Sequence, residues 1–215
     1  MALQRANLSA RDREILDTLT SRVRVLSVAQ VAAFWFAGAA DAKRAAGRRL
    51  RALADRRLIE PFEMPARPTP ALAQPLSCWS PGEALPDFGG LSRTLAQRWT
   101  EPAKQTACII ATAAAGTWLG GHGGRRPRRS EISHDLLLGQ IYLDWRRTHP
   151  DLIASWLSEA RLRCLGFGDQ ARLPDALVDH GGERCVVEVG GEYSPSKLAE
   201  FHAFCASRGL SYELW

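Results

Sequence analysis

The sequence has no run of eighteen apolar residues, and its start, Met1 to Asn7, lacks the charged-then-apolar order of a secretory signal. Both absences predict that the chain is neither inserted in a membrane nor exported, so we expect it in the cytoplasm. With 215 residues, 46% hydrophobic and 24% charged, the chain is long enough to bury a core as one large domain or two small ones.

Two kinds of motif are also missing. The five cysteines are scattered, odd in number and never spaced as CxxC, which argues against a disulfide framework or a structural zinc site. The segment GGHGG, residues 120–124, is not followed by the Gly-Lys-Ser or Gly-Lys-Thr of a phosphate-binding loop. We interpret it as a flexible loop.

Basic residues are concentrated in two places. Residues 1–60 hold 12 Lys plus Arg against 6 Asp plus Glu, an excess of +6, whereas the whole chain has a net charge of +5. This distribution favours a polyanionic partner. The second basic cluster consists of Arg125, Arg126, Arg128 and Arg129.

The first third has the pattern of three short helices followed by strand-like runs. Ser9, Ser27 and Asp41 each precede an apolar-periodic segment, as N-cap residues do. After the third helix, LIEPFEM and LSCWS are expected to pair as a β-hairpin around the Pro-rich stretch 65–75. This order resembles that of the winged helix-turn-helix DNA-binding families, and RRLRALADRRLIEP is similar to their recognition helix running into the wing.

In the third predicted helix, apolar residues take one face and basic residues project elsewhere. Such a helix fits the major groove, where Arg side chains bind guanine or phosphate. An ordinary solvated Arg-rich face is the alternative. Gly47 lowers helix propensity, yet it also permits close approach to DNA. The candidate DNA-binding residues are Lys43, Arg44, Arg48, Arg49 and Arg51, with Arg125, Arg126, Arg128 and Arg129 as further backbone contacts.

From residue 150 onward the pattern changes to an α/β layout. DALVDH and RCVVEVGG are predicted strands joined through a turn, SPSKLAEFHAFCASRG is a helix capped by Ser194 with Pro195 at its first position, and LSYELW is a final strand. This layout, with Pro174-Asp175 followed by Glu188-Val189-Gly190, resembles the PD-(D/E)xK nuclease-like fold.

The resemblance implies that Asp175 and Glu188 hold a divalent metal, and that a lysine two places after the glutamate helps to activate water. Here that position is Gly190, so the motif is incomplete. Lys197 on the following helix is a candidate replacement, and Glu131 or His134 are candidate extra ligands. The alternative is a catalytically degenerate shell in which both carboxylates serve packing or dimerisation.

Over nearly its whole length the chain resembles the replication-relaxation family of plasmids and integrative elements. The residues that carry this resemblance are LSARDREILDTL, RRLRALADRRLIEP, SHDLLLGQIYLDW, LPDALV and VVEVGGEYSPSKLAEF. It implies DNA binding connected with plasmid replication, mobilisation or transcription of mobile-element genes.

We therefore predict an α/β (α+β) protein of two domains. Residues 1–88 form a winged helix-turn-helix domain, 89–130 a linker and connecting helix, and 131–215 a nuclease-like α/β module with a small central sheet. The predicted function is sequence-specific binding of double-stranded DNA as a homodimer, without a cofactor. One rival is a Mg²⁺- or Mn²⁺-dependent endonuclease using Asp175, Glu188 and Lys197. Another is an adaptor that docks on a relaxase, a replication initiator or another mobilisation protein.

Overall fold

The protein, described here by a computed structural model over residues 8–71, 73–167 and 173–215, is of the mixed α/β class that the sequence predicts. It divides into two compact units. Unit 1 comprises Met1–Arg67 and Ala103–Asp144, and unit 2 comprises Pro68–Pro102 and Trp145–Trp215. Each unit is built from two separate segments, so its boundaries differ from the continuous ranges 1–88, 89–130 and 131–215.

The helices at the start of unit 1 begin where the sequence predicts. The Ser9 and Ser27 side chains each accept a hydrogen bond from the backbone N–H three residues later. In return, the side chain of that later residue accepts from the serine backbone N–H, which completes a capping box at each helix start. Asp41 caps the third helix by accepting from the Arg44 backbone N–H at 2.9 Å. These elements are α1 (Ala10–Asp17), a π-helical turn η1 (Thr18–Arg22), α2 (Val28–Trp35) and α3 (Ala42–Asp55).

The sheet of unit 1 has three antiparallel strands in the order β1-β4-β2. They are β1 (Leu26–Ser27), β2 (Ile59–Ala66) and β4 (Lys104–Ala111), and the helix α5 (Ala113–Leu119) follows β4. The hairpin predicted between LIEPFEM and LSCWS is therefore wrong. The latter run forms β3 (Ser77–Trp79) in unit 2, because its Trp79 is buried there and stacks on Tyr212 with ring centroids 5.7 Å apart.

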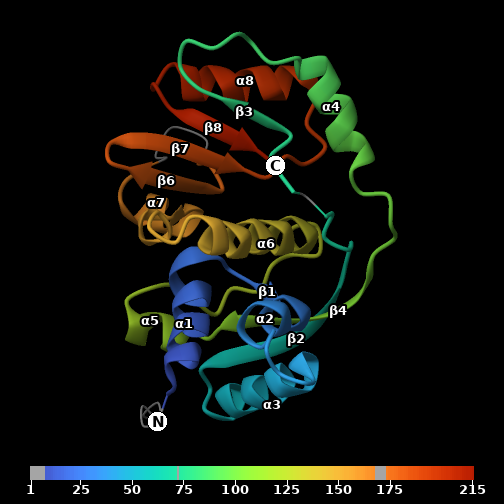
Figure 1. The fold of residues 1–215 in the computed structure, drawn as a ribbon, viewed down its shortest axis with the longest axis vertical. Coiled ribbons are helices and arrows are strands. Elements are labelled where there is room, and N and C mark those ends of the chain that lie inside the picture. The colour runs from blue at the N-terminus through green and yellow to red at the C-terminus, as the bar shows by residue number, and fades with distance from the viewer. Residues whose placement is uncertain (1–7, 72, 168–172) are drawn as a thin grey trace. The chain divides into compact units, whose positions relative to one another are not determined.

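Both faces of this sheet are buried. Phe62, Cys108 and Ile110 pack with Ile132 and Leu136 from the helix α6 (Ile132–Thr148). Because side chains alternate along a strand, their neighbours Ile109 and Ala111 point to the opposite face, and both are also buried. On the helical side α2 packs against α3 (Figure 1).

The GGHGG segment forms a loop, as predicted, and its backbone lies close against other segments of unit 1. The His122 backbone N–H donates to the Thr20 carbonyl at 2.7 Å, and the Gly124 N–H donates to the Ala111 carbonyl at 2.8 Å. A Cβ at Gly121 or Gly123 would lie less than 3.0 Å from a backbone carbonyl oxygen. Glycine is required at these two positions because the backbone passes against other backbone.

Unit 2 is built on a five-stranded sheet in the order β3-β8-β7-β6-β5, in which only β7 and β8 are parallel neighbours. The strands after β3 are β5 (Leu157–Ser158), β6 (Ala176–His180), β7 (Glu183–Glu188) and β8 (Ser211–Leu214). The helical elements are α4 (Phe88–Gln97), the 3₁₀ turn η2 (Ile153–Ser155), α7 (Glu159–Cys164) and α8 (Pro195–Ala206).

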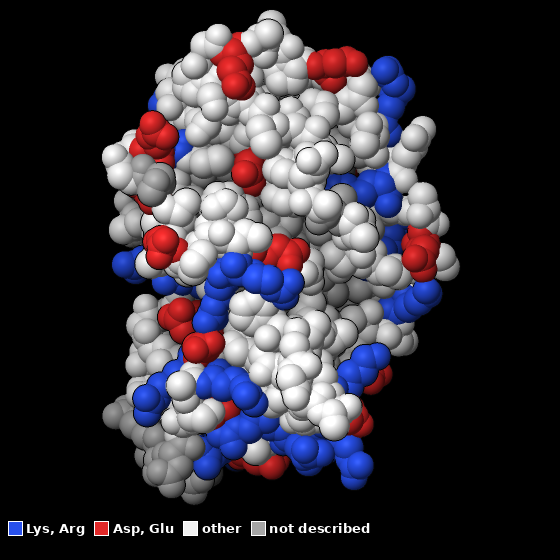
Figure 2. Space-filling view, in the orientation of Figure 1, with Lys and Arg blue, Asp and Glu red and all other residues white. Residues whose placement is uncertain are grey.

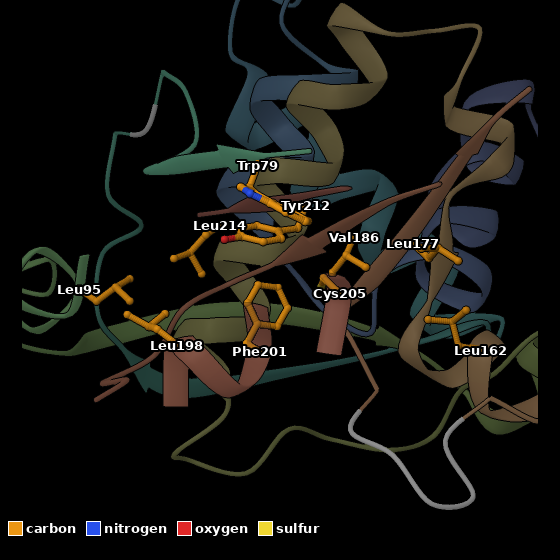
Figure 3. Packing of buried hydrophobic residues seen from close by; sticks show 10 residues of the cluster. All are labelled: Trp79, Leu95, Leu162, Leu177, Val186, Leu198, Phe201, Cys205, Tyr212 and Leu214. Atoms are coloured by element: carbon orange, nitrogen blue, oxygen red, sulfur yellow. The ribbon is translucent and has the colours of Figure 1, made fainter. Parts of the chain in front are cut away.

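One face of this sheet is covered by α8 and α4, which contact each other. Figure 3 shows Leu198, Phe201 and Cys205 of α8 facing Val186 and Tyr212 of the sheet, with Leu95 of α4 beside them. Trp79 and Leu95 of this core come from the segment 68–102, and its other buried residues come from the segment 145–215, so both segments of unit 2 build the core. In the described ranges, no helix combines the length and the apolar character that crossing a bilayer requires.

Gly123→Ala is expected to lower the free energy of unfolding by about 1–3 kcal/mol, because the new methyl group overlaps the Thr112 carbonyl. Thermal or urea unfolding of the purified protein measures this. Gly38→Ala is the matched control, since a Cβ there meets nothing within 4 Å. Equal stability of the two variants would contradict the tight packing of the GGHGG segment.

Candidate nucleic-acid interface and carboxylate pair

The helix α3 has one buried face and one basic face. Ala46, Leu50 and Leu53 are buried in unit 1. The exposed positions include Lys43, Arg44, Arg48 and Arg51. Figure 2 shows Lys and Arg atoms gathered in the lower part of the view, where Figure 1 places α3.

These four cationic side chains are not neutralised by the protein itself. In the part of the chain that the structure describes, none of them lies in an ion pair with a carboxylate. Their spacing of three or four residues places Arg44, Arg48 and Arg51 along one stripe of the helix. The stripe therefore presents uncompensated positive charge to solvent.

Arg49, the fifth candidate on α3, belongs to the fold. Its Nε donates to Asp12 Oδ1 at 2.6 Å, and its Nη2 forms a second bond to Asp12 Oδ2. Asp12 is fully buried in α1, whereas the Arg49 side chain is 32% exposed. The pair ties α1 to α3, so Arg49 is committed to an acidic partner within unit 1 and is removed from the candidate DNA contacts.

The Asp12 carboxylate is the buried partner of this pair. Burial by itself raises the pKa of Asp12, but hydrogen bonds from Arg49 and Ser9 outweigh it and hold the pKa below its usual value. A carboxyl group whose pKa is lowered by folding stabilises the fold at any pH above its ordinary pKa. This stabilisation is lost as the pH falls through the pKa that the group has in the folded state.

The second basic cluster is largely engaged with acidic residues of unit 1. Arg126 Nε donates to Glu60 Oε1 at 2.7 Å, and its guanidinium lies 5.3 Å from the centre of the Phe62 ring. Arg125 and Arg128 lie 3.6 and 4.0 Å from Glu131 Oε1. Arg129 is exposed. Most of the charge in this cluster is therefore compensated locally.

Glu131 receives more than these two arginines. Its Oε2 accepts the Arg128 backbone N–H at 3.0 Å and lies 3.1 Å from Arg24 Nη2. That backbone bond, with the neighbouring guanidinium groups, holds the pKa of Glu131 below its usual value. Arg24 also binds Asp135, whose Oδ1 lies 3.4 Å from His134 Nδ1. Glu131 and His134 thus have partners within unit 1, and nothing brings them into the predicted role of extra metal ligands.

In unit 2 the structure does bring Asp175 and Glu188 together. They occupy the positions next to the end pair of the β6-β7 ladder, Ala176 opposite Val187. Glu188 Oε2 accepts the Asp175 backbone N–H at 3.4 Å, and Asp175 Oδ2 accepts the Val189 N–H at 2.8 Å. Glu188 is only 2% exposed.

Gly190, which stands where the nuclease motif would have lysine, packs against Leu95 and Leu214. Gly190 is buried, and a Cβ there would lie 2.6 Å from Leu95 Cδ2 and 3.3 Å from Leu214 Cδ1. A side chain at this position would therefore require Leu95 of α4 to move. The glycine that departs from the motif is the residue that lets α4 pack here.

Lys197 reaches the carboxylate pair only through Tyr193. Its Nζ lies 3.9 Å from the centre of the Tyr193 ring, and the Tyr193 hydroxyl donates to Glu188 Oε1 at 2.8 Å. Each Glu188 oxygen thus has a donor from the protein. Among the described residues there is no group of three or more His, Cys, Asp or Glu side chains placed to hold a metal ion. These residues do not fit the divalent metal that the resemblance implies.

Sequence reasoning missed Arg98, the cation nearest this end of the sheet. Its Nη2 donates to the Gly190 and Trp215 carbonyls, both at 2.7 Å, and so joins the C-terminal end of α4 to β7 and β8. Burial lowers the pKa of Arg98 to about 10. Its Nε and Nη1 are buried with no hydrogen-bond partner among the described residues. No motif marks this residue, because its partners are main-chain carbonyls more than ninety positions away.

Comparison with known protein families, curated proteins and solved structures finds nothing that matches this chain.

Arg49→Ala is expected to lower the free energy of unfolding by about 2–3 kcal/mol at neutral pH, because it leaves the buried Asp12 carboxylate without its cation. Arg48→Ala is the matched control and should change it by less than about 0.5 kcal/mol. As the pH falls below about 4, the wild type should lose more stability than Arg49→Ala, since only the wild type depends on ionised Asp12 paired with Arg49. Parallel pH profiles would contradict this assignment.

Proposed function

We propose that unit 1 is a winged helix-turn-helix domain that binds double-stranded DNA through α3. Its elements follow the order α1, β1, α2, α3, β2, β4, with the last two strands antiparallel and β1 added at the side of β4. In DNA-binding domains of this kind the second helix of the helix-turn-helix enters the major groove. That helix corresponds to α3.

The observation that carries this proposal is the uncompensated basic stripe of α3. Arginine binds the O6 and N7 atoms of guanine through two hydrogen bonds, and both arginine and lysine neutralise phosphates. Lys43, Arg44, Arg48 and Arg51 are the proposed groove contacts. The exposed Arg129 is the proposed phosphate contact. The hairpin β2-β4 is the proposed wing.

The biological part of the proposal rests on the sequence resemblance to the replication-relaxation family. On that basis the DNA is a site in a plasmid or integrative element, and the protein regulates replication, mobilisation or transcription there, as a homodimer on a palindromic site.

Replacing both Arg44 and Arg48 by Ala is expected to weaken binding to a random-sequence 30-base-pair duplex by about tenfold or more at 100 mM salt, because two cationic contacts are lost. Fluorescence anisotropy across a salt series measures the affinity, and the slope of log K against log salt should become shallower. The double variant Arg93→Ala/Arg161→Ala, at exposed positions of α4 and α7, is the charge-matched control. Unchanged affinity in the double variant would overturn the proposal.

We also propose that unit 2 is a nuclease-like module that does not cut DNA. Its order β5, α7, β6, β7, α8, β8, with β7 and β8 parallel, supports the likeness to the PD-(D/E)xK layout. The engagement of Glu188 by Tyr193 and Asp175, and of Asp175 by the Val189 N–H, supports a role for the carboxylates in closing the β6-β7 ladder. The packing of Leu95 at Gly190 supports the loss of the lysine.

Supercoiled plasmid incubated with the protein and excess Mg²⁺ or Mn²⁺ is expected to stay supercoiled, because the described residues hold no group of three or more His, Cys, Asp or Glu side chains placed to bind the metal ion. Agarose gel electrophoresis measures nicking. Nicking that disappears in Asp175→Ala would establish the endonuclease instead. Tyr193→Phe should leave the plasmid result unchanged.

A further inference from the structure

Gly47 lies in the interior of α3, where neither packing nor backbone conformation calls for a glycine. A Cβ at this position meets nothing within 4 Å, and its φ is not positive. Gly139 of α6 is different, because a Cβ there would lie 3.0 Å from Leu26 Cδ2 and 3.2 Å from the Val25 carbonyl. Glycine is a poor residue for a helix interior. Nothing within unit 1 explains its presence at position 47.

The surroundings of Gly47 on the helix surface are cationic. On a helix, residues three and four positions apart are neighbours. Three of the four such neighbours of Gly47 are Lys43, Arg44 and Arg51, and the fourth, Leu50, is buried. The glycine therefore forms a gap in the middle of the basic stripe.

The dimensions of the stripe match duplex DNA. Residues 43–51 span about 12 Å along the helix axis at about 1.5 Å per residue. The major groove is about 12 Å wide, so a helix segment of this length lies against about three to four base pairs. Asp41 and Asp55 limit the positive region at the two ends of α3.

The stripe carries donors that suit base edges. Arginine presents planar, paired donors that match the O6 and N7 acceptors of guanine, and it matches carboxylates as well, so competition with an acidic polymer has to separate the two partners. Arginine supplies three of the four cations, at positions 44, 48 and 51. Without a Cβ at position 47, the helix backbone can approach the floor of the groove, which brings these side chains within reach of the bases.

We propose that α3 makes its closest approach to the DNA at Gly47, and that Arg44, Arg48 and Arg51 around it read guanine edges in the major groove. This inference rests on the proposed DNA-binding function and names the part of the duplex that is read.

The test compares Gly47→Gln and Gly47→Ala with Gly38→Gln, in the full chain. Gly38 is the matched control because a Cβ there also meets nothing within 4 Å. The probes are poly(dG-dC) and poly(dA-dT) duplexes, and the former duplex made with 7-deazaguanine, which lacks the N7 acceptor. Anisotropy gives the affinities, and thermal unfolding shows that the variants are folded.

Wild type is expected to bind poly(dG-dC) at least about threefold more tightly than poly(dA-dT), and 7-deazaguanine should abolish this preference. Gly47→Gln should weaken poly(dG-dC) binding by about tenfold, and Gly47→Ala by about threefold, without lowering the unfolding midpoint. Gly38→Gln should bind as the wild type does.

Each opposing outcome identifies what has failed. If Arg44→Ala/Arg48→Ala loses affinity while both Gly47 variants bind normally, the close approach at Gly47 is wrong and the proposed function stands. If binding ignores 7-deazaguanine, the reading of guanine is wrong. If poly-L-glutamate competes as well as DNA at equal charge, or if the arginine variant binds normally, the proposed function itself fails.

Discussion

The pairing of β2 with β4 is the constraint on which the rest of the structure depends. The two strands run in register from Ile59 opposite Ala111 to Ala66 opposite Lys104, although residues 67–103 intervene. Closing so long a loop costs only slightly more entropy than closing one of half the length. The eight-residue ladder completes the sheet of unit 1, and the intervening residues supply β3 and α4 to unit 2. Because residues 68–102 between these two paired strands belong to unit 2, both units are discontinuous in the sequence.

Arginine has three different physical roles in this chain, and composition does not distinguish them. Arg49 satisfies a buried carboxylate and joins two helices. Arg98 binds main-chain carbonyls and holds α4 to the sheet of unit 2. Arg48 stands one position before Arg49, yet it faces solvent as part of the basic stripe. The proposed nucleic-acid contacts are therefore the cations that the fold leaves uncompensated.

The carboxylate pair of unit 2 is held in place by hydrogen bonds within the protein. Asp175 and Glu188 meet at the end of the β6-β7 ladder and accept hydrogen bonds from main-chain N–H groups and from Tyr193. A buried carboxylate is tolerated only when it is hydrogen-bonded in this way. The position where the motif has lysine is filled by the contact of Gly190 with Leu95. These contacts hold both carboxylates at the end of the β6-β7 ladder.

The sequence by itself determined the local elements: caps at Ser9, Ser27, Asp41 and Ser194 place four helices, and apolar runs place β2, β6, β7 and β8. Capping and periodicity act over a few residues, so they can be recognised locally. The meeting of Asp175 with Glu188 was also predictable from the nuclease-like pattern. Only the tertiary structure decided that β4 is the partner of β2, that Gly121 and Gly123 lie against backbone, and that Arg49 belongs to Asp12. These three features depend on contacts between residues far apart in the chain. Local sequence preferences are similar for many possible strand and side-chain pairings, and the burial of whole apolar faces selects one of them.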